Sequence, residues 1–288
     1  MTKEIRVNEK HKDRLFNFIF GQEENREWTL SLYNAINGSN YTDASLIEFN
    51  TLEGVLYMNM KNDTSFIISG IWNVYEHQSS FNPNMPYRML EYIVELFSGY
   101  VKVNKLNKYG SSLMKFPIPK LVVFYNGIEE KEDEVILRLS DSFDESETEA
   151  DIEVKVRMLN VNFGRNKAIM QACKPLEEYA WVINRIRETQ KKYKEVVDAV
   201  DEVVESIPND FVIRDLLIRN RAEVYGMLDT EYNEAEIREL FMEDGRREER
   251  ANTERERIRA DEAETRAKEA EKENERLRKL LTQHNIQE

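Results

Sequence analysis

Cysteine is nearly absent from this sequence, which has only Cys173 among its 288 residues. A single cysteine excludes an internal disulfide and a cysteine-rich zinc site. No histidine lies near Cys173 in the sequence, so nothing there indicates an activated thiol. We interpret Cys173 as a side chain that packs in the core.

Long hydrophobic runs are also missing. The sequence has no uninterrupted apolar stretch of about 18 residues, the length that a membrane-spanning helix needs. The first residues, MTKEIRVNEKHKDR, lack the apolar segment of a secretory signal. Both absences predict a cytoplasmic protein with no membrane partner.

Positive charge is scarce, since 41 Lys and Arg stand against 55 Asp and Glu, for a formal net charge of −14. This balance disfavours nucleic acid as a partner, because polyanions attract basic surfaces. Residues 102–120 depart from this balance, because they contain five lysines and no acidic residue. We therefore keep DNA as a partner and predict phosphate contacts from Arg88, Lys102, Lys105, Lys108, Lys115 and Lys120.

Charged residues make up 33% of the chain, against roughly 25% in an average soluble domain. They are concentrated after about residue 231, where Glu, Arg, Lys and Ala predominate. This change in composition predicts a charged helical tail at residues 231–288. We divide the part before it into a globular domain at 1–190 and a helical extension at 191–230.

The spacing of apolar residues predicts an α/β fold for the globular part. Helical spacing runs from Asp13 to Ile36, with a break at Phe20-Gly21-Gln22 and an end at Gly38. Ser69-Gly70 is a hairpin signal between two strands. Strands are predicted at residues 55–59, 64–68, 71–79, 121–125, 135–139 and 152–159, and further helices at 87–101, 174–204 and 210–228. The order helix, three strands, helix, strand is typical of a mixed α/β domain.

The tail has a different periodicity. Apolar and small residues recur at spacings of three and four from Ala260 to Leu281, which is the a/d seam of a coiled coil. Alanine seams bury little surface, however, and a solvated single helix with i,i+4 ion pairs explains the same pattern. The tail is thus either the contact of a homodimer or a lone helix.

The predicted hairpin carries the most informative polar residues. Side chains two apart on a strand share a face, so Glu76 and Gln78 point together while His77 points away. A turn at Ser69-Gly70 places Asp63 opposite Glu76, and a turn one residue later places Asp63 opposite Gln78. Either register brings all three onto one face. His77 is expected at the surface or one layer behind the site.

Two neighbouring carboxylates repel each other unless a positive charge lies between them. A hard cation such as Mg²⁺ fits between oxygen ligands, and it can polarise a phosphoryl oxygen and help to generate hydroxide. Asp63 and Glu76 are the candidate metal ligands. Gln78 stands where many nucleases have a lysine, and it can orient a water molecule without supplying charge.

The pattern Asp63, hairpin, Glu76-x-Gln78 resembles the D…E-x-Q version of the PD-(D/E)XK motif, as found in the recombination-promoting nuclease and putative transposase family. Further stretches carry the resemblance over roughly residues 10–190, namely Asp13-Arg14-Leu15-Phe16, Phe20-Gly21, residues 75–79, 82–86 and 119–127, and Leu159-Asn160-Val161-Asn162. The resemblance implies a restriction-endonuclease-like sheet flanked by helices. It also implies Mg²⁺-dependent endonuclease cleavage of DNA, linked to recombination or transposition.

Other functions remain open from the sequence alone. The chain can be a family member that binds DNA or a partner without cutting, or an assembly protein that acts through its tail. Outside the resemblance, Asp63 reads as a turn residue, and Glu76 and Gln78 as a solvated strand face.

Overall fold

The computed structural model describes residues 15–49, 64–144, 150–192 and 196–227, with the single positions 250, 253 and 257. The chain divides into two compact units after Ala235, and the sheet and helices below belong to the first. The predicted strand at 55–59, the tail seam and Asp63 lie outside the described residues. No helix in the described ranges is long and apolar enough to cross a membrane.

The centre of the fold is a mixed six-stranded sheet in the order β1-β2-β3-β4-β6-β5. Its core is parallel, because β3, β4 and β6 run the same way, and the outer pairings are antiparallel. The strands are β1 (Glu48–Phe49), β2 (Thr64–Ile68), β3 (Ile71–Gln78), β4 (Ile118–Tyr125), β5 (Glu134–Arg138) and β6 (Lys155–Asn160). The chain is therefore of the α/β class.

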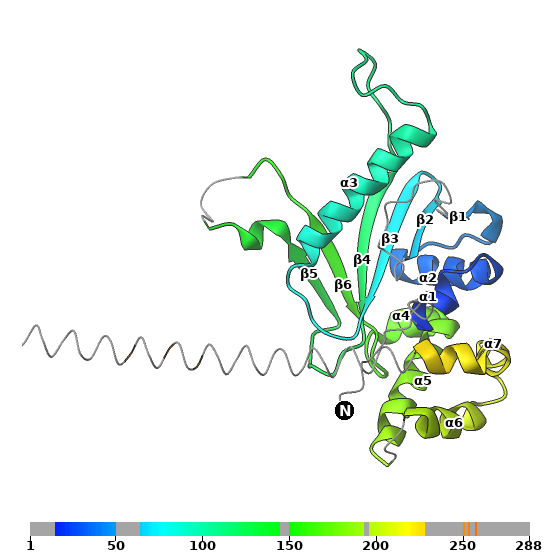
Figure 1. Ribbon diagram of the computed structural model, residues 1–288. Coiled ribbons are helices and arrows are strands. Elements are labelled where there is room, and N and C mark those ends of the chain that lie inside the picture. Colours follow the sequence, from blue (N-terminus) through cyan, green and yellow to red (C-terminus); the bar gives the residue numbers. More distant parts are fainter. Residues whose placement is uncertain are drawn as a thin grey trace, which may run out of the picture. The chain divides into compact units, whose positions relative to one another are not determined.

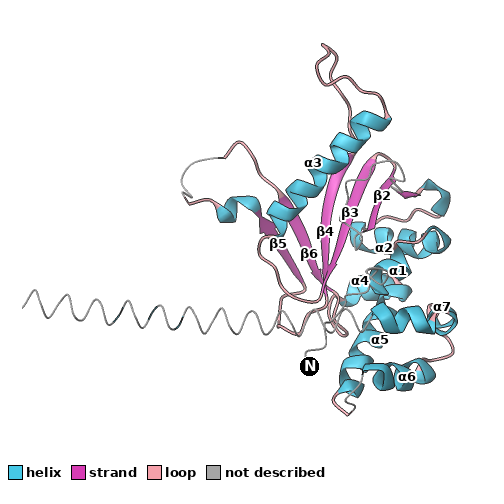
Figure 2. Cartoon of the chain, in the orientation of Figure 1, coloured by secondary structure: helices cyan, strands magenta, loops and turns pink. Residues whose placement is uncertain are grey.

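Helices cover both faces of this sheet (Figures 1 and 2). The helix α3 packs on one face with Trp72, Val74 and Val123, and the other helices pack on the opposite face. The helices are α1 (Leu15–Phe20), α2 (Arg26–Asn37), α3 (Met85–Val103), α4 (Lys167–Ala172), α5 (Lys174–Gln190), α6 (Val196–Ser206) and α7 (Arg214–Arg219), with the 3-10 turns η1 (Glu23–Asn25), η2 (Ala44–Leu46) and η3 (Leu139–Ser142).

The hairpin between β2 and β3 has the first of the two predicted registers. Ile68 pairs with Ile71, and Thr64 pairs with Tyr75. The turn residues Ser69 and Gly70 have φ of 48° and 76°. Two successive positive φ values are those of the turn that best matches the twist of a two-residue hairpin.

The local signals around the first helices are confirmed. The α1 helix ends at Phe20, and α2 ends at Asn37 with Gly38 in the left-handed conformation, φ 62°. Glycine is common at this position because it has no Cβ to clash. The helix predicted at 87–101 is confirmed as α3, whose buried residues include Met89, Ile93 and Leu96.

Two helix predictions are wrong in extent. The single helix predicted at 174–204 is divided into α5 and α6, which pack through Ile183, Ile186, Val200 and Val203. One continuous helix could not bury both of these apolar faces against each other. The helix predicted at 210–228 is likewise interrupted, because α7 ends at Arg219 and residues 221–227 form a separate helical piece.

Candidate active site

Glu76 and Gln78 lie at the carboxyl end of β3, on the face that α3 covers. Their side chains contact each other and residues of the first turn of α3. Both are buried, with exposed fractions of 4% and 2%. The alternation of the strand explains the shared face. The alternative interpretation of these two residues as part of a solvated strand face is therefore wrong.

The carboxylate of Glu76 is held on one oxygen only. Its Oε1 accepts a hydrogen bond from Gln78 Nε2 at 3.0 Å and forms an ion pair with Arg88 Nη2 at 2.8 Å. Its Oε2 is buried and has no hydrogen-bond partner among the described residues. A buried carboxylate oxygen without a partner is costly, so it marks a place for a further donor or cation.

The amide of Gln78 has a defined orientation. Its Nε2 lies 3.0 Å from Glu76 Oε1 and 2.7 Å from Met85 Sδ, so both amide hydrogens face acceptors. The reversed amide would set its oxygen against the carboxylate oxygen, which is repulsive. Gln78 Oε1 is thus the outward atom, and it too is buried without a partner among the described residues.

The two remaining oxygens, Glu76 Oε2 and Gln78 Oε1, fit a hard cation such as Mg²⁺, which takes oxygen ligands and keeps several waters. The part of the chain that the structure describes has no group of three or more His, Cys, Asp or Glu side chains suited to a metal. The residues present thus fit part of a metal site, and the remaining carboxylate ligand expected from the sequence is Asp63.

His77 points to the opposite face of the sheet, as its strand position predicted. It is buried, stacks on Phe16 at 5.2 Å between ring centroids, and lies with its Nε2 2.8 Å from the hydroxyl of Tyr179. Asn126 Nδ2 donates to the same hydroxyl at 2.9 Å. His77 is therefore not a surface residue, and Tyr179 joins the ends of β3 and β4 to α5.

Sequence reasoning did not single out Tyr179 or Asn126. The sequence marks Asn126 and Gly127 as the residues that end a buried strand, but it gives no signal for Tyr179 beyond helical spacing. A Cβ at Gly127 would lie 2.6 Å from the carbonyl oxygen of Ser79, so only glycine lets the loop after β4 approach the end of β3 this closely.

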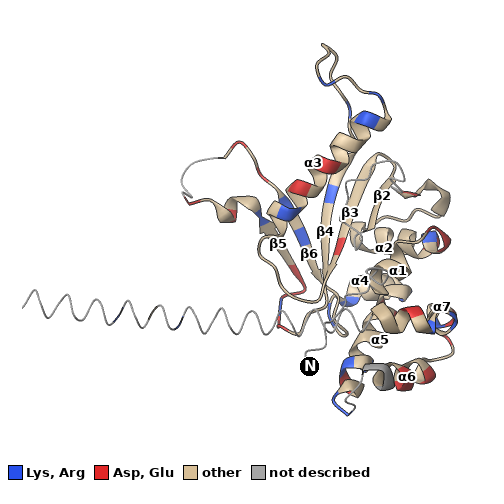
Figure 3. Cartoon of the chain, viewed as in Figure 1, with Lys and Arg blue, Asp and Glu red and all other residues tan. Residues whose placement is uncertain are grey.

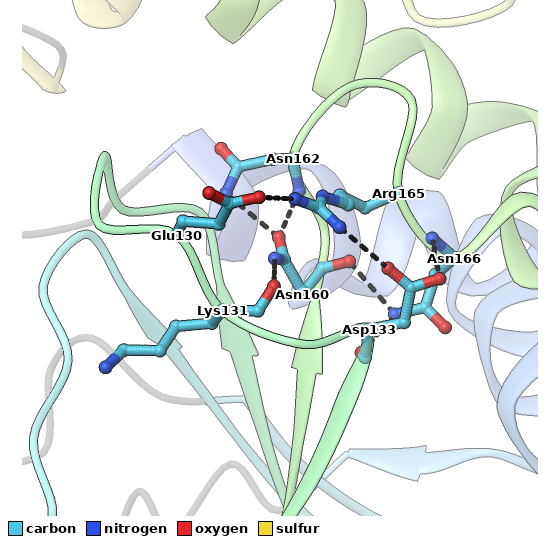
Figure 4. A network of polar contacts seen from close by, with 7 residues as sticks. All are labelled: Glu130, Lys131, Asp133, Asn160, Asn162, Arg165 and Asn166. Atoms are coloured by element: carbon cyan, nitrogen blue, oxygen red, sulfur yellow. Dashed lines mark hydrogen bonds and ion pairs between the residues drawn. The ribbon is translucent and has the colours of Figure 1, made fainter.

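The Asn160 and Asn162 pair supports the loops at this edge of the sheet (Figure 4). Asn160 Nδ2 donates to the carbonyl of Lys131 at 2.9 Å, and Asn162 Nδ2 donates to Asn160 Oδ1 at 2.9 Å. Arg187 of α5 donates to Asn162 Oδ1 at 2.9 Å and also to the carbonyl of Asn126. These asparagines hold the loop after β4 in place, and their amides are used in doing so.

The predicted DNA-contacting residues separate into two places. Arg88 lies at Glu76, in the first turn of α3. The lysines lie at the other end of α3 and of β4, which begins beside Ile71 and ends beside Gln78 (Figure 3). An α-helix rises about 1.5 Å per residue, so roughly 22 Å of α3 separate Arg88 from the end of the helix. The lysines are Lys102 in α3, Lys105, Lys108 and Lys115 in the following loop, and Lys120 in β4.

Cys173 is fully buried between α4 and α5, as predicted for a packing residue. Burial raises the pKa of its thiol to about 11. A thiol with that pKa is almost entirely protonated at neutral pH, so it is a poor nucleophile. Burial and a protonated thiol both agree with a packing role for Cys173.

Comparison with known proteins yields one family. No curated protein and no solved structure matches the chain. The family described as "Putative transposase, YhgA-like" matches residues 44–210, more than half of the chain, a range that includes Glu76, Gln78 and Arg88. The protein therefore belongs to this putative transposase family, which is of the PD-(D/E)XK type.

Proposed function

We propose that the protein is a metal-dependent DNA endonuclease with a restriction-endonuclease-like fold, in which Asp63, Glu76 and Gln78 form the active site. The observation that carries the proposal is the buried carboxylate of Glu76, with one oxygen paired and the other without a partner among the described residues. The family match and the Gln78 amide beside it support the same function.

Glu76 Oε2 and Gln78 Oε1 are the protein atoms that would face Mg²⁺ and its water molecules. Bound Mg²⁺ would polarise the scissile phosphate and lower the pKa of a bound water molecule. Gln78 Oε1 can accept a hydrogen bond from that water and so orient it toward phosphorus. Since Gln78 carries no charge, its contribution is orientation and not general-base catalysis.

Asp63 completes the proposed ligand set. It precedes Thr64, which pairs with Tyr75, and Tyr75 precedes Glu76. If the antiparallel register continues by one residue, Asp63 lies opposite Glu76 and shares its face of the sheet. This neighbour relation is our reason for proposing a shared cation between the two carboxylates.

DNA is the proposed substrate, and the lysines after α3 are proposed to contact the duplex at a second place, distant from the active site. No acidic residue interrupts residues 102–120, and Lys105, Lys108 and Lys115 stand in an exposed loop. The outer face of α3 between the loop and the site carries Glu91 and Glu95, which repel phosphate. The loop is thus a second contact, separate from the cutting site.

One observation favours a second candidate, a family member that binds DNA without cutting. Glu76 already has a cationic partner in Arg88. An ion pair that never opens would keep a metal from this oxygen, and the domain would then act as a binding module.

Cleavage of supercoiled plasmid tests the proposal. We expect wild type to nick or linearise the plasmid with Mg²⁺ and to lose this activity with EDTA. Glu76→Gln and Asp63→Asn are expected to lower the rate by at least about a hundredfold, because each removes a proposed charged ligand. Glu177→Gln, which changes an exposed carboxylate on α5, should cleave as wild type does.

Equal cleavage by wild type and Glu76→Gln would show that the site is elsewhere or that a contaminant cuts. DNA binding without any Mg²⁺-dependent cleavage would favour the binding module.

A further inference from the structure

We propose that Arg88 is a cationic counterpart to the metal at Glu76. In the metal-free protein Arg88 neutralises the Glu76 carboxylate. When a divalent cation binds Glu76, Arg88 releases this carboxylate and binds the substrate phosphate instead. This inference rests on the proposed nuclease function, and it assigns the source of positive charge that Gln78 lacks.

The contacts of Arg88 place its guanidinium at the site. Nη2 lies 2.8 Å from Glu76 Oε1 and donates to the hydroxyl of Tyr92 at 2.7 Å. Nη1 lies 3.4 Å from Met85 Sδ, and the guanidinium stands over the ring of Tyr92 at 5.7 Å from its centroid. The side chain of Arg88 is 33% exposed while that of Glu76 is 5% exposed. Arg88 therefore connects a buried acid to solvent.

Competition with a metal follows from charge. A divalent cation coordinated by Glu76 would stand within a few ångströms of the guanidinium, and like charges at that distance repel. Each cation must therefore weaken the binding of the other. Removing the guanidinium should tighten metal binding, even though it also removes a contact of the site.

A structural role for Arg88 predicts the opposite sign. If the guanidinium only held Glu76 in position, its loss would loosen the carboxylate and weaken metal binding. The direction of the change in metal affinity therefore separates the two roles, independently of cleavage.

Phosphate is the natural second partner of Arg88. A guanidinium offers parallel N–H donors that match the oxygens of a phosphate. In nucleases with lysine at the third motif position, that lysine brings a positive charge beside the glutamate. Here the residue is Gln78, whose Nε2 donates to Glu76 Oε1, and the charge at the same oxygen comes from Arg88.

The experiment measures Mg²⁺ binding without DNA, by calorimetry, alongside plasmid cleavage. Arg88→Gln is expected to bind Mg²⁺ roughly three- to tenfold more tightly, the scale of one partly buried ion pair. Its cleavage rate at saturating Mg²⁺ should fall by about a hundredfold. Arg88→Lys keeps the charge but not the parallel N–H donors, and it should restore part of the rate. Arg185→Gln, which removes an exposed arginine paired with Glu188 on α5, should change neither quantity.

Thermal unfolding keeps the proposal testable if Arg88→Gln is unstable. Without metal, the single variant leaves Glu76 as a buried charge and should unfold at a lower temperature. In a Glu76→Gln background the same change should have little effect, and Mg²⁺ should stabilise Arg88→Gln more than wild type.

Unchanged or weaker Mg²⁺ binding by Arg88→Gln would overturn the competition, and an unchanged cleavage rate would overturn the phosphate role. Either result leaves the nuclease function intact if Glu76→Gln still abolishes cleavage. If wild type does not cleave at all, the nuclease function fails, while the metal-binding result still decides whether Arg88 competes.

Discussion

At the scale of single residues, the site depends on which polar atoms are already engaged. Gln78 Nε2 donates its hydrogens to Glu76 Oε1 and Met85 Sδ, so the side-chain oxygen of Gln78 is the atom that remains for a ligand. Glu76 uses one oxygen on Arg88 and Gln78, which leaves the other. Both atoms are acceptors or ligands, and neither can donate a proton. These two atoms therefore do not serve as a general acid, and a metal held there would supply the acid chemistry that they lack.

Tyr179 is expected to stabilise the site from the opposite face of the sheet. Its hydroxyl lies between His77 Nε2 and Asn126 Nδ2. Tyr179→Phe removes this buried hydroxyl and should lower the free energy of unfolding by about 1–3 kcal/mol. For a chain of this size that corresponds to a fall in Tm of several degrees, measured by circular dichroism.

Tyr109→Phe is the matched control, because Tyr109 is 87% exposed and its hydroxyl supports no buried contact in the described residues. A stability of Tyr179→Phe equal to that of the control would show that the His77 and Asn126 contacts are replaced by water at no cost.

At the scale of elements, the sequence predicted most strands because each has a simple cause. The strand at 121–125 is apolar throughout, and β4 is buried there on both faces. The Ser69-Gly70 signal limited the hairpin of β2 and β3 to two registers, and the first of them is observed. The boundary between α5 and α6 could not be found, because their packing on each other is a tertiary contact that leaves the helical periodicity intact.

Part of the geometry of the candidate site could also be predicted from the sequence. Strand alternation alone places Glu76 with Gln78 and turns His77 away. It cannot show that α3 brings Arg88 to Glu76, or that Tyr179 of α5 meets His77, 102 positions earlier in the chain. Those contacts depend on how helices pack on the sheet.

The loop after α3 is expected to contact duplex DNA several base pairs away from the phosphate that is cleaved. Glu substitution of Lys105, Lys108 and Lys115 should weaken binding and reduce the salt dependence, by roughly 0.9 in log–log slope per lost contact. The roughly 22 Å between loop and site corresponds to about seven base pairs at about 3.4 Å each, so shorter duplexes should not show the effect.

The control replaces three exposed lysines outside the loop with Glu, namely Lys155, Lys167 and Lys191. It gives the same change in net charge. Equal affinity and salt slope for the two triple variants would mean that net charge, and not the loop, governs binding.

At the scale of the whole molecule, the net charge of −14 has to be reconciled with the polyanionic substrate that we propose. In the proposed complex the basic loop would supply local attraction, and a bound metal would offset the carboxylates of the site. A nuclease with one site also needs two copies to cut both strands of a duplex together. The proposed dimer contact is the seam from Ala260 to Leu281, which lies outside the described residues.

We expect this seam to join two protomers weakly, because alanine side chains bury little area at about 25 cal/mol per Å². Asn274 at a seam position would favour a parallel pair in fixed register, at some cost in stability. Light scattering over a wide concentration range should show a concentration-dependent dimer for the full chain and a monomer for a chain truncated near Glu231. Plasmid cleavage by the truncated chain should then give nicked circles before linear product, because its sites act one at a time. Equal masses for both chains at every concentration would show that the tail is a solvated helix and that double-strand cutting, if seen, needs another contact.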